Sequence, residues 1–273
     1  MTDYARIIIT GASSGLGAAY ARALSSTTRE MVLIARRKER LEQLAAELIS
    51  QKPDLTALVM PCDLSNAAER SALCRALAEL PARRCLLVNN AGLGDYGELL
   101  TAQAEKIGQL MQVNMLAPVE LTHALLPSMT QSGGDIINIA SLAADVFLPD
   151  FALYAAGKSF VASFSEAMTI ELRQRGIRVL AVCPGPVHTE FGSVAQRAGH
   201  DRGDIPFKRF FYTSIPTVVH GSLRALAKGK SRYYPSVKVW IAGCILRFMP
   251  LWLIRLILRA RPRRVTPQPP PAA

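Results

Sequence analysis

Cysteine is scarce in this chain, and its placement excludes the sites that cysteine most often builds. The 273 residues include five cysteines, an odd number that cannot pair completely into disulfides. No two of them stand at a metal-ligand spacing, so the sequence predicts no metal site. Three lie in or beside apolar runs, which predicts buried, reduced thiols at Cys62, Cys85 and Cys183.

A long uncharged apolar run is also missing. The most hydrophobic stretch, residues 237–258, is interrupted by Lys238, Arg247 and Arg255. No uncharged segment therefore reaches the roughly 18 residues that a membrane-spanning helix needs. An apolar strand is expected within a few residues of Met1, which leaves no room for a signal peptide. The sequence predicts a cytoplasmic protein, with peripheral contact at the cytoplasmic face of a membrane as the remaining option.

Acidic residues are scarce at one end of the chain. The formal net charge is +11. Residues 197–264 contain fifteen Lys and Arg residues against two acidic residues, whereas the rest of the chain contains seventeen basic and nineteen acidic residues. The excess positive charge therefore belongs to the C-terminal end. Its basic residues are interleaved with bulky aliphatic residues, which argues against a nucleic acid partner.

What the chain does contain is a regular alternation of apolar strands and helical segments. Six runs predict strands at Ile7–Thr10, Met31–Ala35, Leu55–Met60, Leu86–Asn89, Asp135–Ala140 and Arg178–Cys183. Helical patterns between them include Lys38–Ser50, Ala67–Leu80 and Ala102–Met129. The alternation predicts an α/β fold, a doubly wound (Rossmann) parallel sheet with helices on both faces. We expect a single domain with a C-terminal amphipathic helical extension.

A glycine-rich segment, Thr10-Gly-Ala-Ser-Ser-Gly-Leu-Gly17, lies between the first predicted strand and a helical run. Glycines allow a tight turn and a close approach of the backbone to a ligand. The N-terminus of the following helix then faces an anionic pyrophosphate. The spacing is Gly-x-x-x-Gly-x-Gly instead of the more common Gly-x-Gly-x-x-Gly. Its position between a strand and a helix nevertheless predicts a dinucleotide-binding loop.

Tyr154 and Lys158 are four residues apart, and Ser141 precedes the tyrosine by thirteen residues. Residues four apart share one face of a helix, so the phenol and the ammonium can project into the same space. A nearby cation favours phenolate and lowers a phenol pKa that starts near about 10. A hydroxyl beside such a tyrosine can hold a carbonyl oxygen for proton transfer. Taken alone, the spacing also fits an ordinary surface pair on an amphipathic helix.

Together these motifs resemble the short-chain dehydrogenase/reductase family over about residues 5 to 190. The resemblance implies that Tyr154 exchanges a proton with the substrate oxygen and that Ser141 orients the carbonyl. Lys158 would lower the tyrosine pKa and hold the nicotinamide ribose. Asn114, in Val113-Asn-Met115, would position a water that relays protons through Lys158.

The resemblance extends to the cofactor site through Cys62-Asp-Leu64, Asn89-Asn-Ala-Gly92 and Pro184-Gly-Pro-Val-His-Thr189. With the two arginines after the second strand, the expected cofactor-binding residues are Gly11, Ser13, Ser14, Gly15, Leu16, Gly17, Arg36, Arg37, Asp63, Leu64, Asn90, Ala91, Gly92, Tyr154, Lys158, Pro184, Gly185, Val187 and Thr189.

The end of the second predicted strand indicates which dinucleotide is bound. An NAD enzyme usually places an acidic side chain there to bind both ribose hydroxyls, but Ala35 occupies that position here. A guanidinium can bind a 2′-phosphate through paired, charge-assisted hydrogen bonds. We therefore expect NADP(H), with Arg36 as the main ligand, Arg37 as a second and Ser13 as a further contact. Lys38 more simply begins a solvated helix.

Apolar side chains flank the expected catalytic residues. They predict a small lipophilic carbonyl or alcohol substrate, although each alone could simply cover the core. Residues 191–215 contain three glycines and are expected to form a mobile lid over the pocket. The candidate substrate contacts are Leu142, Phe147, Phe151 and Phe191.

Residues 1–235 are expected to form the catalytic domain, 236–264 a basic apolar helical extension and 265–273 a disordered proline-rich tail. Pro250 should divide the extension into two short helices. Two tryptophans, branched aliphatic residues and flanking arginines predict peripheral membrane contact through residues 237–264. Closure of the substrate pocket or a homodimer interface is the alternative.

These observations predict an NADP(H)-dependent oxidoreductase that interconverts a lipophilic ketone or aldehyde and an alcohol by hydride transfer. The substrate would be of the ketoacyl, ketosteroid or long-chain carbonyl type, and the protein a homodimer or homotetramer. The alternative is a weakly catalytic NADP-binding protein, acting as a redox-sensing or membrane-recruited scaffold. The intact Ser141, Tyr154 and Lys158 argue against that alternative, because a pure binding protein has no evident need for them.

Overall fold

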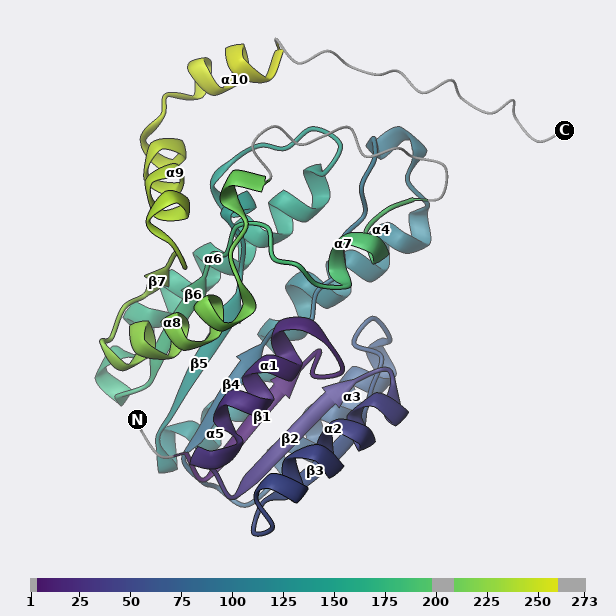
Figure 1. Ribbon diagram of the computed structural model, residues 1–273, viewed down its shortest axis with the longest axis vertical. Coiled ribbons are helices and arrows are strands. Elements are labelled where there is room, and N and C mark those ends of the chain that lie inside the picture. The colour runs from purple at the N-terminus through teal and green to yellow at the C-terminus, as the bar shows by residue number, and fades with distance from the viewer. Residues whose placement is uncertain (1–3, 198–208, 260–273) are drawn as a thin grey trace, which may run out of the picture.

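The computed structural model describes residues 4–197 and 209–259, which contain a seven-stranded parallel sheet (Figure 1). The strands are β1 (Arg6–Thr10), β2 (Glu30–Ala35), β3 (Thr56–Pro61), β4 (Cys85–Asn89), β5 (Gly134–Ile139), β6 (Arg178–Val182) and β7 (Arg232–Tyr233). They lie in the order β3-β2-β1-β4-β5-β6-β7. The order reverses between β1 and β4, and ligands of open α/β sheets bind at the carboxyl ends of the strands at such a point.

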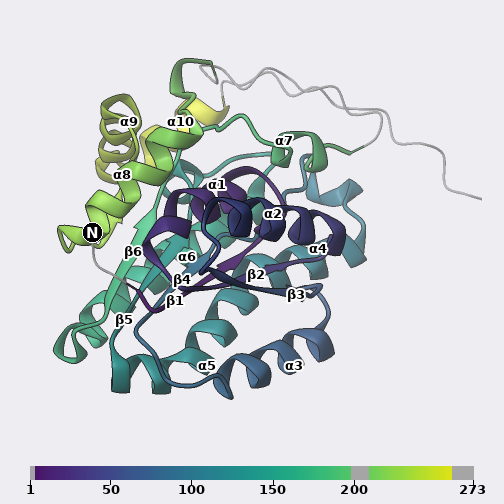
Figure 2. The same cartoon turned by 60° about the horizontal axis from the view of Figure 1, so that its bottom comes forward.

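The helices of the main body are α1 (Gly15–Leu24), α2 (Lys38–Gln51), α3 (Ala67–Ala78), α4 (Ala104–Met111), α5 (Ala117–Ser132), α6 (Ala152–Glu171), α7 (Phe191–Val194) and α8 (Ile215–Ala227). Figure 2 shows α1, α2 and α8 on one face of the sheet and α3 and α5 on the other, where α4 and α6 also contribute to the core. The predicted doubly wound fold is therefore confirmed.

The strands are apolar throughout because both of their faces are buried. Successive side chains of a strand point to opposite faces. Ile7 and Ile9 of β1 join the core cluster that contains α1, α2 and α8, whereas Ile8 joins the cluster on the other face. All three side chains are fully buried. This two-sided burial is why the parallel strands are continuous hydrophobic runs in the sequence.

The six predicted strands are confirmed within one residue at each end, but two elements differ from prediction. β7 has only two residues and no apolar pattern of its own, so the sequence gives no signal for it. The single helix expected over Ala102–Met129 is wrong, because a π-helix, η3 (Gln112–Leu116), separates α4 from α5. Pro118 lacks the N–H that would donate to the carbonyl of Asn114 in a regular α-helix, so the hydrogen-bond pattern is broken there.

The C-terminal extension forms α9 (Val237–Phe248) and α10 (Leu251–Arg259), as Pro250 predicts. Within the described ranges, no single helix is long and apolar enough to span a membrane. α9 and the first seven residues of α10 have that apolar length only when taken together, and they are bent by 115° at the break. Figure 1 shows α10 standing apart from the sheet. The expected proline-rich tail and part of the expected lid lie outside the described residues.

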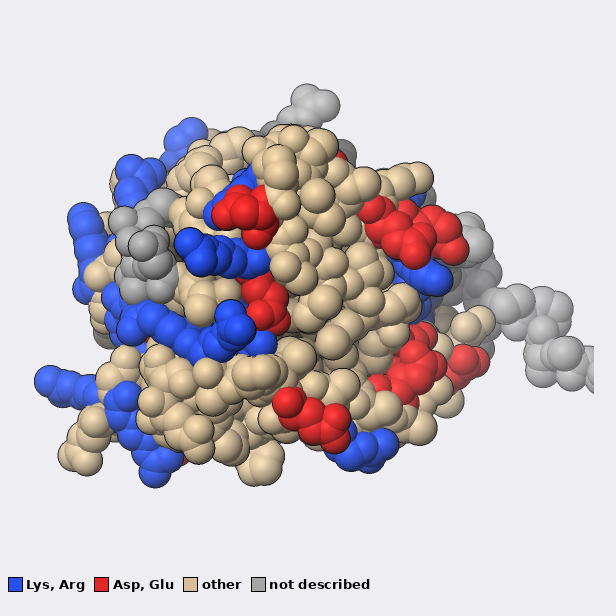
Figure 3. Space-filling view, turned by 90° about the horizontal axis from the view of Figure 1, so that it is seen from below, with Lys and Arg blue, Asp and Glu red and all other residues tan. Residues whose placement is uncertain are grey.

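The charges are unevenly spread over the molecule. Figure 3 shows the face seen from below, where Lys and Arg gather on the left and most Asp and Glu lie toward the right. The left side of this view is the side of α8, β7 and α9 in Figure 1. Basic side chains are therefore concentrated on one side of this face.

Candidate active site

Ser141, Tyr154 and Lys158 meet at the carboxyl end of β5. Ser141 directly follows the strand region, and the other two side chains come from the first two turns of α6. The Tyr154 hydroxyl lies beside the Ser141 side chain, close enough for that side chain to lower its pKa. Lys158 Nζ lies 5.7 Å from the centroid of the Tyr154 ring and donates to the carbonyl of Ile139 at 2.7 Å. The predicted triplet is therefore one cluster in the folded protein.

Asn114 joins this cluster from the π-helix η3. Its side chain accepts from Leu93 N and donates to Leu93 O, both at 2.8 Å, so it fixes the segment after β4. A Cβ added to Gly92 would lie 3.5 Å from both Asn114 Oδ1 and Lys158 Nζ, which places this glycine between the two side chains. Asn114 and Lys158 also line a small cavity of about 10 Å³. That is about the volume that one water molecule needs.

The pKa of Tyr154 differs from the sequence-based expectation. Burial raises the pKa of the Tyr154 hydroxyl to about 12, and the Ser141 side chain offsets only part of that rise. Burial also lowers the pKa of Lys158 to about 8. Burial therefore keeps the net pKa of the phenol above its usual value. The lowering contribution expected from Lys158 stays a prediction.

The glycine-rich segment is held in a tight turn by its neighbours. Asn90 Nδ2 donates to Thr10 O at 2.9 Å and to Gly11 O at 3.3 Å. A Cβ at Gly17 would collide with the backbone of Gly11, and Gly15 has a φ of +55°, which favours glycine. Ser14 begins α1 without a side-chain cap, so the first N–H groups of this helix are left to another acceptor.

The segment after β6 runs beside both the glycine loop and the Ser141 loop. A Cβ at Gly15 would approach the Thr189 side chain to 3.1 Å. Leu142 N donates to Pro184 O at 2.9 Å. Asp63 lies beyond β3, where its carboxylate accepts from Ser65 N and Ser65 Oγ at 2.9 and 2.7 Å. The segments that follow β1, β4 and β6 thus meet where the cofactor site is expected, and Leu64, which follows β3, lines the small cavity together with Thr10 and Ala91.

Of the two arginines after β2, Arg37 reaches the glycine loop. Its Nη2 donates to Ser13 Oγ at 3.1 Å and to Ser14 Oγ at 2.8 Å. Arg36 is exposed and has no side-chain partner within the described part of the chain. Lys38 pairs with Glu42 one turn along α2, as expected for the start of a solvated helix.

Aromatic rings surround the Tyr154 side chain. The Phe151 ring stacks on it at 4.2 Å between centroids, and the Phe191 ring lies at 5.4 Å. Tyr96, which the sequence does not single out, lies 5.1 Å from Phe151. Phe147 is 57% exposed, so it is not part of this aromatic cluster. Phe191 belongs to α7, which makes the described beginning of the expected lid part of the site.

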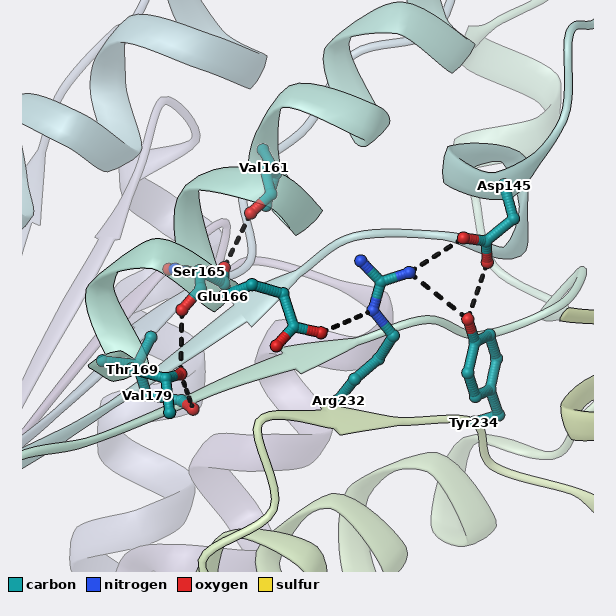
Figure 4. Close-up of polar contacts among 9 residues, drawn as sticks. Asp145, Val161, Ser165, Glu166, Thr169, Val179, Arg232 and Tyr234 are labelled. Atoms are coloured by element: carbon teal, nitrogen blue, oxygen red, sulfur yellow. Dashed lines mark hydrogen bonds and ion pairs between the residues drawn. The ribbon is translucent and has the colours of Figure 1, made fainter. Parts of the chain in front are cut away.

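A charged network holds Asp145, at the end of the segment Leu142–Asp145 that follows Ser141 (Figure 4). Arg232 of β7 donates to Asp145 at 2.8 Å and to Glu166 of α6 at 3.0 Å. Tyr234 also donates to Asp145, at 2.7 Å. Breaking such a buried pair typically costs about 3–5 kcal/mol, because one charge is left without a partner. The sequence does not reveal this support, since β7 has no pattern that predicts it.

The comparisons with known proteins agree with this geometry. A sequence model of the short chain dehydrogenase family matches residues 5–198. Dehydrogenase/reductase SDR family member 7B from Bos taurus is 32% identical over 190 residues, which cover 67% of this chain and 58% of that protein. Ketoacyl reductase HetN from Nostoc sp. is 35% identical over 184 residues, which cover 66% and 63%. The matches thus span less than two thirds of each relative's own length.

A solved structure extends the similarity to nearly the whole chain. The short-chain dehydrogenase from Sphingobium yanoikuyae in complex with NADPH has a TM-score of 0.76 and 30% sequence identity. The superposition covers 96% of this chain and 98% of that chain. The structural similarity therefore continues beyond the residues that the family's sequence model matches, into the C-terminal helices.

Proposed function

Because this chain belongs to the short-chain dehydrogenase family, we propose that it is an NADP(H)-dependent oxidoreductase that interconverts a lipophilic ketone or aldehyde and the corresponding alcohol. The observation that carries the proposal is the position of the Tyr154 hydroxyl. The Tyr154 ring packs against the Phe151 and Phe191 rings, and the hydroxyl lies beside the Ser141 side chain. A proton donor under an apolar cover suits a carbonyl group on a hydrophobic molecule.

The residues around the glycine loop fit NADP(H). The tight glycine turn leaves room for a pyrophosphate, and the uncapped start of α1 offers N–H donors to it. Arg37 and Ser13 would hold the 2′-phosphate. The Sphingobium yanoikuyae enzyme, whose structure contains NADPH, supports this choice. NADP(H), when bound, supplies or accepts the hydride in this chemistry.

In carbonyl reduction, Tyr154 would give its proton to the substrate oxygen, which Ser141 holds in place. A phenol whose pKa is raised to about 12 stays protonated at neutral pH, so it is ready to act as an acid. Asn114, Lys158 and the small cavity that they line would return a proton to the phenol. The reverse reaction needs phenolate, so alcohol oxidation should require a more alkaline solution than carbonyl reduction.

The aromatic cluster supports a lipophilic substrate over a sugar or a charged acid. Phe151, Phe191 and Tyr96 contribute apolar surface close to the Tyr154 hydroxyl. The name of the HetN relative, a ketoacyl reductase, points to the same class of carbonyl compound. A ketoacyl lipid, a ketosteroid or a long-chain ketone or aldehyde would fill such a pocket.

A panel of carbonyl compounds and alcohols tests this function. We expect the absorbance of NADPH to fall with long-chain or polycyclic ketones at pH 7, and to change little with ketosugars or 2-oxo acids. Oxidation of the matching alcohols with NADP should become faster as the pH rises above neutral. Turnover restricted to sugars or charged acids would contradict the assigned substrate class. Binding of NADPH without turnover of any compound would favour the scaffold alternative.

We also propose that α9 and α10 contact an anionic membrane surface. Most of their large apolar side chains are exposed: Val237, Trp240, Ile241, Ile245, Phe248, Leu251, Trp252, Leu256 and Ile257. Basic side chains on the same helices complement anionic headgroups, and residues 237–259 include no acidic residue. Val239 and Gly243 pack against the main body, which leaves the other side of α9 available for lipid.

Flotation with lipid vesicles tests this contact. We expect the protein to float with vesicles containing phosphatidylserine, and less with neutral vesicles or at high salt. Replacing Trp252 and Leu256 together by serine should reduce flotation, whereas Ile170→Ser, an exposed apolar residue of α6, should not. Equal flotation of both variants would exclude this surface. If the Trp252 and Leu256 changes instead dissociate a homodimer or homotetramer, the two helices form an interface between subunits.

A further inference from the structure

One carboxylate, that of Glu190, holds two arginines at the mouth of the expected cofactor site. Arg37 Nη1 donates to Glu190 Oε2 at 2.8 Å, and Arg40 Nη1 donates to Glu190 Oε1 at 2.7 Å. Glu190 comes between Thr189 and the first residue of α7, whereas both arginines lie at the start of α2. The contact therefore joins the segment beside the catalytic residues to the segment that follows β2.

In this ion pair the Arg37 guanidinium contacts Glu190 through Nη1. The other edge, formed by Nε and Nη2, faces the glycine loop and donates to Ser13 Oγ at 3.3 and 3.1 Å. Two neighbouring guanidinium nitrogens form the fork that matches a phosphate group. Glu190 thus binds Arg37 from one side while the phosphate-binding edge points toward Ser13.

We propose that Glu190 is a positioning residue for NADP(H), which orients Arg37 so that its Nε–Nη2 edge meets the 2′-phosphate beside Ser13. The inference rests on the proposed function, because it requires NADP(H) as the ligand. The Arg37 side chain is 42% exposed, so without its partner it would be free to sample solvent. Ordering it again on binding would cost affinity. Arg40 also pairs with the Glu190 carboxylate. The two arginines and the glutamate therefore keep a net positive charge, which favours binding of the phosphate.

Titrations of NADPH and NADH, followed by the fluorescence of the reduced nicotinamide, test this role without measuring turnover. Glu190→Gln should raise the Kd for NADPH by about 2- to 5-fold at low ionic strength, the range expected for an exposed ion pair. The Kd for NADH should stay unchanged, because NADH has no 2′-phosphate. In an Arg37→Ala background, Glu190→Gln should have no further effect on NADPH binding.

Glu47→Gln is the control for a change of charge near the site, since Glu47 forms an exposed pair with Arg22, lines a surface pocket with Ser13 and Arg40, and its loss changes the net charge equally. This variant should leave both affinities unchanged. An unchanged or lower Kd for NADPH in Glu190→Gln would overturn the positioning role, and so would an equal effect on NADH. Failure of the unaltered protein to bind NADPH would instead contradict the proposed function.

Discussion

Replacing Tyr154 by phenylalanine is expected to slow carbonyl reduction by about 10³-fold or more, within the range that a lost general acid produces. Phenylalanine keeps the ring that packs against Phe151 and Phe191, so the aromatic cover should persist. It removes the hydroxyl that lies beside Ser141 and that we propose as the proton donor. The affinity for NADPH, measured by fluorescence titration, should remain close to that of the unaltered protein.

Tyr233→Phe is the control for this result. Tyr233 belongs to β7, and its hydroxyl makes one long hydrogen bond within the described ranges, to Pro235 O at 3.4 Å. Tyr233→Phe should reduce the carbonyl substrate at the same rate as the unaltered protein. If Tyr154→Phe turned over at the unaltered rate, Tyr154 could not be the proton donor. If the variant lost NADPH binding together with turnover, the effect would be structural instead of chemical.

The sequence predicts the elements of this fold where burial alone decides the residue pattern. β1, β2 and β4 have helices on both faces, so their apolar runs are unambiguous. The break between α4 and α5 is different. It accompanies Pro118 and the two hydrogen bonds between Asn114 and Leu93, and such a contact between distant segments leaves no periodic pattern. Asn114 could be singled out from the sequence, but the local helix geometry around it could not.

The protonation of Tyr154 shows a second limit of reasoning from the sequence. A lysine four residues away suggests a lowered phenol pKa, because the two side chains share a helix face. The folded protein buries both groups, and burial disfavours phenolate and ammonium alike. Whether burial or a nearby cation has the larger effect on the phenol pKa can be decided only when the depth of the site is known. The consequence is functional, since a protonated Tyr154 suits reduction at neutral pH.

The arginines after β2 illustrate a third limit. Adjacent residues leaving a strand point in different directions, so the sequence alone cannot say which arginine faces the glycine loop. Arg36 follows the strand first and is the simpler expectation as the main phosphate ligand. In the fold, Arg37 contacts both Ser13 and Ser14, whereas Arg36 is exposed. Glu190, far along the chain, is the partner that fixes this arrangement.

Arg37→Ala is therefore expected to raise the Kd for NADPH by about 10- to 100-fold, which corresponds to losing hydrogen bonds to a charged group worth about 1.5–3 kcal/mol. Arg36→Ala should change it much less, because only Arg37 bonds to the loop serines within the described residues. The affinity for NADH should stay nearly constant in both variants, so the preference for NADPH should fall mainly in Arg37→Ala. Parallel fluorescence titrations with the two dinucleotides measure this difference.

The comparison between the two variants also separates two sources of cofactor preference. Each substitution removes one positive charge from adjacent positions, so a general attraction for the phosphate would weaken by similar amounts in both. A contact made through the oriented edge of one guanidinium would weaken in Arg37→Ala alone. A larger loss in Arg36→Ala would assign the main phosphate contact to Arg36, and the interaction of Glu190 with Arg37 could then not explain the preference for NADPH.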